Sequence, residues 1–303
     1  MRWNKLGLVF DPEVFTWAEN TALQPTPLVL EDRIRVFLGS RDAAGVGRIG
    51  FVDLDKQDPT KVLGYSSAPV LDIGEPGCFD ESGVVPSAVV ADDGLVYMYY
   101  AGYQLGTKVR FSVLGGLAIS HDNGLTFTRH KKTPVFERND KETLFRVPHS
   151  VIKEGDKWRA WYGGGSQFAQ GKIKTLPIYN VRYVESNTPF SFPEAGVVLL
   201  ETEGEEYRIG RPFIFRRSDS EFYLFYGYST ENSPYKLGCA KSRDMKTWER
   251  IDNELGMPLS KDGWDSEMMA YPSVVELNGK VFLFYNGNDY GKQGFGLAEL
   301  LEW

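Results

Sequence analysis

The 303-residue sequence contains only two cysteines and three histidines. Cys78 and Cys239 fall in different copies of a repeat described below, so we expect two reduced thiols rather than a disulfide. His121, His130 and His149 have no metal-ligand spacing with one another or with either cysteine, which disfavours a zinc site. The residues therefore indicate neither a cofactor nor a metal.

Long apolar runs and long basic runs are also missing. No stretch of about 18 apolar residues could span a membrane. The N-terminal segment MRWNKLGLVFDPEVF lacks the continuous apolar region of a signal peptide, so a cytoplasmic location is the expectation. The formal net charge of −7 disfavours a nucleic-acid surface. Composition thus predicts neither a membrane nor a nucleic-acid partner, and it leaves the oligomeric state open.

Helical periodicity is scarce as well, which disfavours a TIM barrel. A hairpin-like pattern occurs five times instead: a proline, a short apolar run, a polar turn, and a second run rich in aromatic and β-branched residues. Two copies read VPSAVVADDGLVYMYYAG and YPSVVELNGKVFLFYNG. The prolines that register the copies recur about every 60 residues, at Pro25, Pro86, Pro148, Pro212 and Pro272.

A third segment follows each hairpin, and its fuller copies place Ser, then Asp or Asn, then an aromatic residue, as in Ser242, Asp244 and Trp248. This pattern predicts a third strand, a tight turn and a fourth strand. Four antiparallel strands repeated radially predict an all-β fold, a five-bladed β-propeller formed by residues 1–303 as one domain. The last copy ends at Trp303 before a fourth strand. We expect the N-terminal strand, RWNKLGLVF, to complete that blade and close the ring.

Ligands of propellers usually bind at the central channel, where the loops that lead into the innermost strands converge. The proline-anchored strand is expected to be the innermost strand of each blade. Residues just before the prolines therefore sample the mouth of the channel, and they are Gln24, Val85, Val147, Arg211 and Tyr271.

This arrangement of an x-Pro inner strand, a hairpin and an outer S-x-D-x-x-x-W strand resembles the five-bladed propeller glycosidases. These are the arabinanase and xylosidase group, the invertase and levansucrase group, and the mannoside phosphorylases. The segment FRVPHSVIKEGDKWRAWYGGG is similar to the invertase R-D-P segment, with Arg146 and Pro148 kept and Val147 in place of the aspartate. The closing YPSVVELNGKVFLFYNGNDYGKQGFGLA resembles glycosidase-like proteins of bacterial surface-polysaccharide genes. The resemblance implies a saccharide ligand, and it allows calcium or another ion in the channel. The arginines described below extend the expected ligands to a sugar phosphate.

The usual acids of this group are missing. For arabinanase-like enzymes the resemblance implies an aspartate as general base, a second aspartate as pKa modulator and a glutamate as general acid. The comparable positions hold Gln24, Val85 or Val147, and Arg211 or Gly210. None of these side chains exchanges a proton near neutral pH, so inverting hydrolysis by these positions is not expected.

Carboxylates occur a little further upstream, at equivalent positions of two copies. CFDESGVVPS contains Asp80 and Glu81, and WDSEMMAYPS contains Asp265 and Glu267. Blades 2 and 5 would flank blade 1, so these loops could present acids on either side of a sugar that lies over Gln24. Glycoside hydrolysis needs such a pair, about 5–5.5 Å apart for a nucleophile or about 6.5–9.5 Å apart for a water. The four carboxylates are candidate catalytic acids, and the alternative is that they are solvated loop acids or turn caps.

Cations form a second group of candidates. Guanidinium forks suit phosphate or carboxylate, and an attacking phosphate would make the base aspartate dispensable. The alternative is structural ion pairing with acids such as Glu142 and Glu206. The candidate substrate-binding residues are Gln24, Arg41, Arg146, His149, Arg211 and Tyr271, with Arg208 and the rim aromatics Phe168, Trp264 and Tyr290 beside them.

Three functions follow from these residues. The first is a glycoside hydrolase-like enzyme for an anionic or surface-polysaccharide-related sugar, with Glu81 and Glu267 as the reacting carboxylates. The second is a phosphorylase or transferase that uses Arg146, Arg211 and His149 to hold phosphate. The third is a non-catalytic glycan-binding propeller.

Overall fold

The computed structural model describes residues 1–303 and is built almost entirely of strands. It has one short helix, α1 (Asn288–Gly291), and two 3-10 turns, η1 (Pro12–Val14) and η2 (Asp252–Glu254). No helix of the protein is long and apolar enough to cross a membrane. Both cysteines are free thiols.

The strands pair into three sheets of four, twelve and four strands. Short parallel contacts join three antiparallel sets in the twelve-stranded sheet, so the chain has five antiparallel units of four strands each. Units 1 to 4 follow the chain in order, and unit 5 takes its outer strand from the N-terminus. Unit 1 consists of β2 (Asn20–Val29), β3 (Arg33–Arg41), β4 (Gly47–Asp55) and β5 (Val62–Tyr65). Unit 2 consists of β6 (Val84–Asp92), β7 (Leu95–Leu105), β8 (Phe111–Ser120) and β9 (Thr128–Arg129). Unit 3 consists of β10 (Phe145–Glu154), β11 (Lys157–Gln170), β12 (Thr175–Ser186) and β13 (Val197–Leu200). Unit 4 consists of β14 (Glu206–Ser218), β15 (Glu221–Thr230), β16 (Ser233–Ser242) and β17 (Glu249–Arg250). Unit 5 consists of β18 (Ala270–Leu277), β19 (Lys280–Asn286), β20 (Phe295–Glu302) and β1 (Arg2–Phe10).

In units 2 and 5 the first hairpin closes through a two-residue turn that its sequence encodes. Asp93 and Gly94 join β6 to β7 with φ angles of 48° and 73°, and Asn278 and Gly279 join β18 to β19 with φ angles of 52° and 76°. Left-handed φ at both positions matches the right-handed twist of the flanking strands, and Asn, Asp and Gly are the residues that adopt it most readily. The repeated turn therefore fixes the register of these hairpins.

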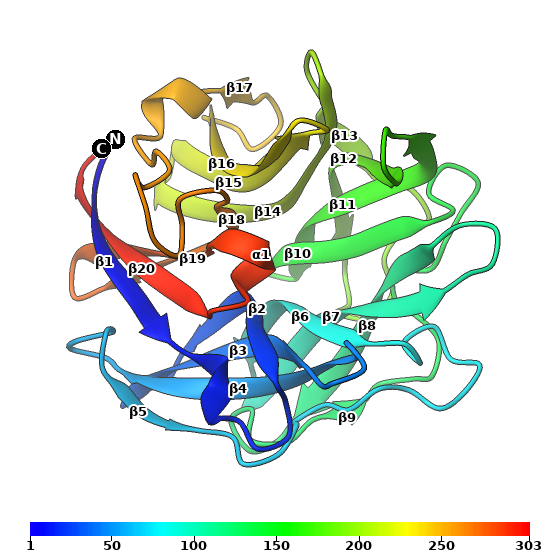
Figure 1. Ribbon diagram of the computed structural model, residues 1–303, viewed down its shortest axis with the longest axis horizontal. Helices are drawn as coiled ribbons and strands as arrows, with labels where there is room; N and C mark the ends of the chain where they lie inside the picture. Colours follow the sequence, from blue (N-terminus) through cyan, green and yellow to red (C-terminus); the bar gives the residue numbers. More distant parts are fainter.

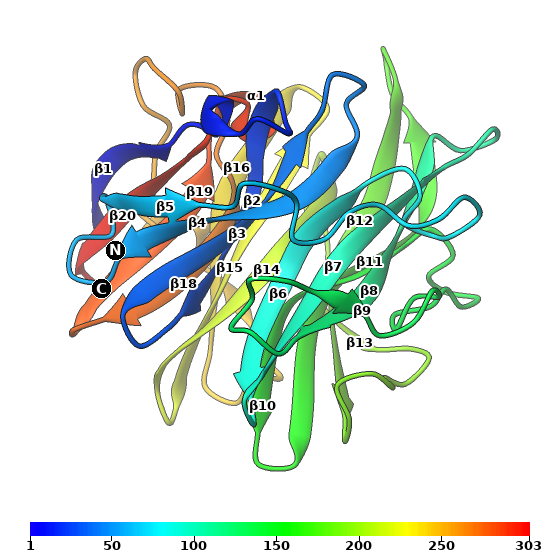
Figure 2. The ribbon, with the colours of Figure 1, turned by 90° about the horizontal axis from the view of Figure 1, so that it is seen from below.

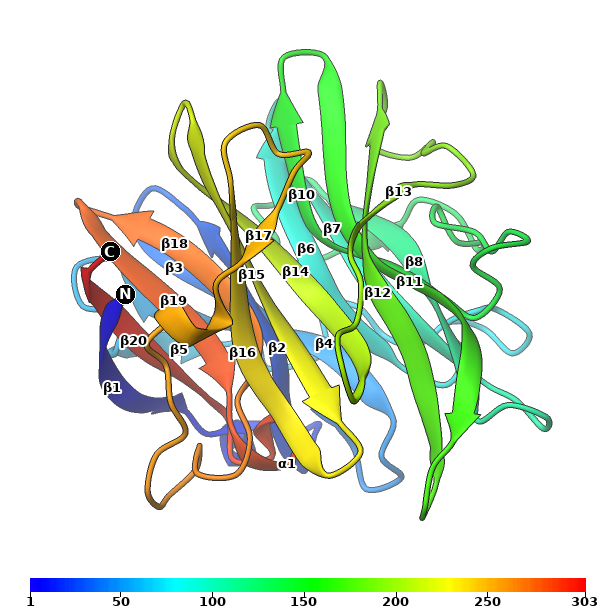
Figure 3. The same cartoon turned by 90° about the horizontal axis from the view of Figure 1, so that it is seen from above.

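The units are arranged in a propeller-like way, with the first strand of each unit nearest the centre (Figure 1). These first strands are β2, β6, β10, β14 and β18, and each carries one of the five registering prolines. The views from below and from above show the strands running across the thickness of the molecule, with loops on both faces (Figures 2 and 3). Helix α1 and the tip of the β11–β12 hairpin lie on the same face (Figure 3).

The N-terminal strand joins the last unit, as the sequence predicts. Strand β1 pairs with β20 in an antiparallel register that runs from Arg2 opposite Glu302 to Phe10 opposite Phe295. The two chain ends consequently lie side by side (Figure 1). Units 5 and 1 also touch at the centre, where the Ser273 hydroxyl donates a hydrogen bond to the Pro25 carbonyl at 2.8 Å.

The core consists of apolar side chains that neighbouring units contribute to shared clusters. In one cluster Val36 of unit 1 packs with Phe284 of unit 5, and in another Tyr99 of unit 2 packs with Trp158 of unit 3. The second strand of each unit supplies many of the buried aromatics, because it lies between two neighbouring strands of its own sheet and faces another unit. Burial of large aromatic side chains is a main source of stability in such packing.

Candidate functional site

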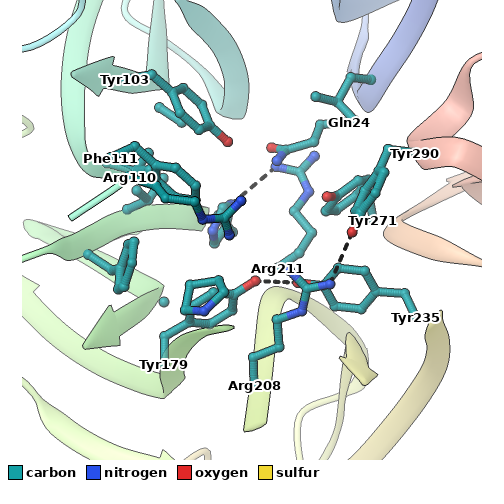
Figure 4. A pocket seen from close by; sticks show the side chains of 18 of the residues that line it. Gln24, Tyr103, Arg110, Phe111, Tyr179, Arg208, Arg211, Tyr235, Tyr271 and Tyr290 are labelled. Atoms are coloured by element: carbon teal, nitrogen blue, oxygen red, sulfur yellow. Dashed lines mark hydrogen bonds between the residues drawn. The ribbon is translucent and has the colours of Figure 1, made fainter. Parts of the chain in front are cut away.

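The innermost strands surround a cavity of about 350 Å³ at the centre of the molecule (Figure 4). Its polar lining consists of cations and phenols, together with one amide and one imidazole. The cations are Arg41, Arg110, Lys174, Arg208 and Arg211, the phenols are Tyr103, Tyr179, Tyr207, Tyr235, Tyr271 and Tyr290, and the remaining two are Gln24 and His149.

No aspartate or glutamate lines this cavity. Five cations without a carboxylate give the cavity a local positive charge, although the whole chain carries a formal net charge of −7. A cleft lined by one sign of charge concentrates ligands of the opposite sign. The electrostatics therefore favour an anion.

Three cavity residues occupy the position before a registering proline and have left-handed backbone. Gln24, Arg211 and Tyr271 have φ angles of 57°, 55° and 57°. Each stands with its proline in a register shift of the β2–β3, β14–β15 or β18–β19 pair. Each register shift is a β-bulge. Proline has no N–H to donate to the neighbouring strand, so a bulge at this residue loses no hydrogen bond. Left-handed φ in such bulky residues costs of order 1–3 kcal/mol and is typical of functional sites.

Arg211 connects unit 4 with all four other units. Its Nη2 donates to Thr26 Oγ1 of unit 1 at 2.9 Å and to Ser273 Oγ of unit 5 at 3.4 Å. Its Nη1 donates to the Ser87 carbonyl of unit 2 and lies 3.5 Å from His149 Nδ1 of unit 3. The side chain thus crosses the middle of the cavity (Figure 4).

None of these partners of Arg211 is a carboxylate, and its Nε is buried without a hydrogen-bond partner. The residue is only 3% exposed. Burial lowers the pKa of Arg211 to about 9, and it lowers the pKa of the neighbouring His149 well below its usual value. A buried cation without a counter-ion is unfavourable unless a ligand supplies the negative charge.

Arg208 contacts two of the phenols that line the cavity. Its Nε donates to Ser229 Oγ at 2.7 Å, and its Nη2 donates to the Tyr290 hydroxyl at 3.2 Å. The guanidinium stacks on the Tyr235 ring at 3.9 Å, and the Tyr235 hydroxyl is hydrogen-bonded to that of Tyr179. Arg208 is therefore rigidly held, again without a carboxylate partner (Figure 4).

Asp80 and Asp265, two of the candidate acids, are buried within their units and do not line the cavity. Asp80 accepts hydrogen bonds from Tyr100 at 3.0 Å and from Arg129 at 2.8 Å. Asp265 accepts from Tyr285 at 3.0 Å and from Lys5 Nζ at 2.8 Å. In both units the tyrosine follows the carboxylate by 20 residues. The same structural contact therefore occurs within each of these two units.

Unit 3 repeats this contact with a glutamate. Glu142 accepts a hydrogen bond from Tyr162 at 2.7 Å, and it pairs with Arg146 and Arg182 at 3.0 Å each. Arg146 is therefore a structural residue of unit 3, and it does not reach the cavity. The pattern that predicts paired acids at equivalent loop positions thus has a structural origin, because units 2, 3 and 5 each bury one carboxylate against the tyrosine of their second strand.

The other two candidate acids lie on the surface side of their loops. Glu81 accepts hydrogen bonds from the Gly77 N–H at 2.6 Å and from Gln104, and the backbone hydrogen bond contributes most to lowering its pKa. Glu267 is exposed and lines a second pocket, of about 330 Å³, at the rim. The structure therefore does not bring the four carboxylates together around one sugar-sized space.

The rim pocket adjoins the central cavity, because several residues line both. The shared residues are Lys174, Leu176, Tyr207, Arg208 and Tyr290. Its acids are Glu231, Glu267 and Asp289. No group of three or more His, Cys, Asp or Glu side chains in the protein is arranged to hold a metal ion.

Of the six predicted substrate-binding residues, all but Arg146 line the cavity. Among the rim aromatics Tyr290 lines it, whereas Trp264 packs on Tyr285 with ring centroids 4.9 Å apart, and Phe168 packs on Phe145. The residues that sequence reasoning missed come from second and third strands and their loops: Tyr103, Arg110, Lys174, Tyr179, Tyr207 and Tyr235. Only Tyr207 carried a signal, since it stands beside Arg208.

The glycines of the segment WYGGGSQF serve close packing. A Cβ on Gly164 would stand 2.5 Å from Glu142 Oε1, and one on Gly165 would stand 2.1 Å from the Ile178 carbonyl. Gly163 lines the cavity beside His149. Larger side chains would push β11 away from β12 and from the Glu142 ion pairs.

Comparison with known proteins agrees with this architecture. Residues 70–199 match the family described as "Glycosyl hydrolases family 32 N-terminal domain". A solved structure described as "Glycoside hydrolase" superposes with a TM-score of 0.73 at 18% identity, covering 99% of this chain and 92% of that one. The GH43_1 enzyme from Xanthomonas citri complexed with xylose superposes with a TM-score of 0.66 at 12% identity, covering 98% and 89%.

The chain thus has a fold like that of propeller glycosidases such as the GH43_1 enzyme, and a part of it, residues 70–199, matches the glycosyl hydrolase family 32 domain. The uncharacterized protein Rv1502 of Mycobacterium tuberculosis is 31% identical over 303 residues, which is 99% of each chain. The chain belongs to the same family as this mycobacterial protein.

Proposed function

We propose that the five units are the blades of one closed propeller, and that the central cavity is its ligand site. The hydrogen bonds of Arg211 to all four other units support a common centre. The contact of unit 5 with unit 1 supports closure, because the Gln24 N–H donates to Asn286 Oδ1 at 2.8 Å. In this arrangement residues far apart in the chain share one pocket.

We propose further that the protein is a carbohydrate-active protein whose ligand is an anionic saccharide. One observation carries this proposal: Arg211 is buried, without a carboxylate partner, in a cavity lined by five cations and no acid. A sugar carboxylate or phosphate would provide the missing negative charge, and guanidinium groups bind both through charge-assisted hydrogen bonds. The six tyrosines offer ring faces for the apolar side of a pyranose and hydroxyls for its polar edge.

Matched pairs of ligands test this proposal. Glucuronate, glucose 6-phosphate and glucose differ mainly in charge, and calorimetry measures their dissociation constants for the whole protein. We expect both anionic sugars to bind at least about 10-fold more tightly than glucose, which corresponds to about 1.4 kcal/mol. The preference should weaken as salt rises. Equal affinity for the neutral and anionic sugars would contradict the proposal.

Dependence on added phosphate separates a phosphorylase from a binding protein without activity. A phosphorylase would bind inorganic phosphate at the same arginines, and turnover of a glycoside would depend strictly on added phosphate. A binding protein without activity would hold the saccharide and release no product. Product analysis with and without phosphate distinguishes these two functions.

A hydrolase that uses Glu267 is the second candidate function. Its supporting observation is that Glu267 lines the rim pocket beside Arg208 and Tyr290, so a sugar that spans both pockets would pass this carboxylate. Replacement of Glu267 by Gln should then abolish release of reducing sugar and leave binding unchanged. Replacement of Glu81 by Gln is the matched control, because Glu81 lines neither of these two pockets.

A further inference from the structure

Tyr290 stands where the central cavity meets the rim pocket, and it lines both. An oligosaccharide with one residue in each pocket would therefore place the bond between the two sugars next to this phenol. Tyr290 lies in α1, and the backbone is left-handed at both Asp289 and Tyr290, with φ angles of 52° and 60°. Strain of this kind at a bulky residue is typical of groups that are held for function.

The surroundings of Tyr290 favour its phenolate. Arg208 donates the hydrogen bond at 3.2 Å described above. Although burial raises the pKa of Tyr290, the nearby Arg208, Lys174 and Arg41 lower it below the usual value. Three exposed carboxylates, Asp289 on the same helix and Glu231 and Glu267, line the rim pocket together with Tyr290. The neighbouring phenols are Tyr103, Tyr207, Tyr235 and Tyr271.

A second phenol next to Tyr290 stays protonated. The rings of Tyr271 and Tyr290 have centroids 6.3 Å apart (Figure 4). Burial raises the pKa of Tyr271 well above its usual value. The cavity thus combines a phenol whose pKa is lowered with one whose pKa is raised, and two groups shifted in opposite directions are suited to the roles of base and acid.

This set of groups does not fit hydrolysis in the central cavity. Cleavage of a glycosidic bond by water normally requires two carboxylic groups, and the cavity has none. Elimination from a uronate needs other groups: cations that neutralise the carboxylate, a base for the proton on C5, and an acid for the departing oxygen. The carbanion character that develops beside the carboxylate is stabilised by fixed positive charges.

We propose, on the basis of the anionic-saccharide function above, that this protein cleaves uronate-containing saccharides by β-elimination, with Tyr290 as the base and Tyr271 as the acid. Arg208 and Arg211 hold the uronate carboxylate in the central cavity, and the preceding sugar occupies the rim pocket. The Tyr290 phenolate removes the proton from C5, and the electron pair of that C–H bond forms the C4=C5 double bond. The C4–O bond breaks, and the departing oxygen takes the proton of the Tyr271 phenol. Exchange with solvent then restores both tyrosines, so water is not consumed and nothing is oxidised or reduced.

The experiment has two stages and uses the full-length protein. The first measures binding of oligomers of galacturonate, mannuronate and glucuronate, each beside a neutral oligomer of the same length. The second incubates every oligomer that binds and analyses the products by ultraviolet absorbance and mass spectrometry. We expect products that absorb as unsaturated uronates and whose masses add up to that of the substrate, with no water added.

Variants test the assigned residues. Tyr290→Phe keeps the ring and should leave the dissociation constant within about 2-fold, while the rate falls by about 10²–10⁴-fold, the usual contribution of a general base. Tyr65→Phe is the matched control, because Tyr65 is 48% exposed and lies outside both pockets, and its rate should not change.

The outcomes separate this inference from the function on which it rests. Binding of acidic oligomers without unsaturated product, or products whose masses add up to that of the substrate plus one water, would overturn the elimination and leave the anionic-saccharide function standing. Failure of all acidic oligomers to bind more tightly than their neutral counterparts would overturn both. Full activity of Tyr290→Phe on a substrate that is eliminated would overturn the assignment of the base.

Discussion

Arg208 and Tyr290 form a hydrogen bond of 3.2 Å between Nη2 and the phenolic oxygen, and neither residue has a carboxylate partner. The contact joins strand β14 of unit 4 to helix α1, which follows unit 5's second strand. The positive charge of Arg208 in unit 4 therefore affects the pKa of Tyr290 in α1.

The first prediction concerns this ionisation. Arg208→Gln removes the positive charge that stabilises the phenolate, so the pKa of Tyr290 should rise. Any activity that requires the phenolate should therefore move to higher pH. Carbon NMR of ring-labelled tyrosine, assigned with Tyr290→Phe, measures the shift, and Arg2→Gln on the 65%-exposed Arg2 is the charge-matched control.

The second prediction concerns the buried charge of Arg211. A ligand that binds only the folded protein stabilises it by about 2.7 kcal/mol at one hundred times its Kd. Glucuronate at constant ionic strength should therefore raise the melting temperature of the wild type by several degrees and should have little effect on Arg211→Met. Arg211→Lys retains a positive charge and should recover part of the effect. An equal rise in all three proteins would show that the anion acts elsewhere.

The third prediction tests Asp265 as a structural residue. Burial raises its pKa, but hydrogen bonds from Lys5, Ser260 and Tyr285 outweigh this and lower the pKa below its usual value. Because the folded-state pKa is depressed, its contribution to stability is present at neutral pH and is lost as the pH falls through that pKa. Asp265→Asn should cost about 2–3 kcal/mol at pH 7, less than the roughly 3–5 kcal/mol of fully buried pairs because the Lys5 side chain is 24% exposed.

Urea unfolding at several pH values measures this cost, and the deficit of Asp265→Asn should shrink under acid conditions. Glu302→Gln is the control, because Glu302 is 70% exposed and its ion pair with Arg2 is on the surface. We expect that control to change stability by less than about 0.5 kcal/mol. A variant of Asp265 that keeps full stability would contradict the structural role.

The fourth prediction uses the left-handed backbone before Pro25. At Gln24, with φ of 57°, Gly should be more stable than Ala by about 1 kcal/mol, because only Gly adopts this conformation without strain. Val85 holds the same position in unit 2 without a positive φ, and there Ala should be more stable than Gly by roughly 0.5–1 kcal/mol. Thermal unfolding of the four variants gives both differences. The same sign at both sites would refute the strain argument.

The strand repeat was predictable from the sequence because its signals are local. Hairpin turns such as Asn278–Gly279 and the alternating apolar runs around them are readable within about 20 residues. The N-terminal strand was also predictable, since the last repeat lacked a fourth strand and MRWNKLGLVF supplied one. The prediction that pre-proline residues reach the centre succeeded for Gln24, Arg211 and Tyr271 for the same reason: the repeat fixes which strand of each unit is innermost.

The roles of the candidate catalytic carboxylates could not be predicted from the sequence. Asp80 and Asp265 recur at equivalent positions, and a recurrence of acids is compatible with a catalytic pair or with a structural contact in each unit. The sequence also contains the matching tyrosines, Tyr100 and Tyr285, 20 residues later. The direction of each side chain decides between the two, and direction depends on packing between strands.

The sequence by itself determined a chain of repeated antiparallel hairpins, because turn chemistry and the alternation of apolar residues act over short distances. Only the tertiary structure decided that arginines and tyrosines from all five units converge on one cavity and that every carboxylate is kept out of it. The physical reason is that the cavity is made of contacts between residues as far apart as Gln24 and Tyr290, and their spacing follows from how the sheets pack rather than from any segment of the chain.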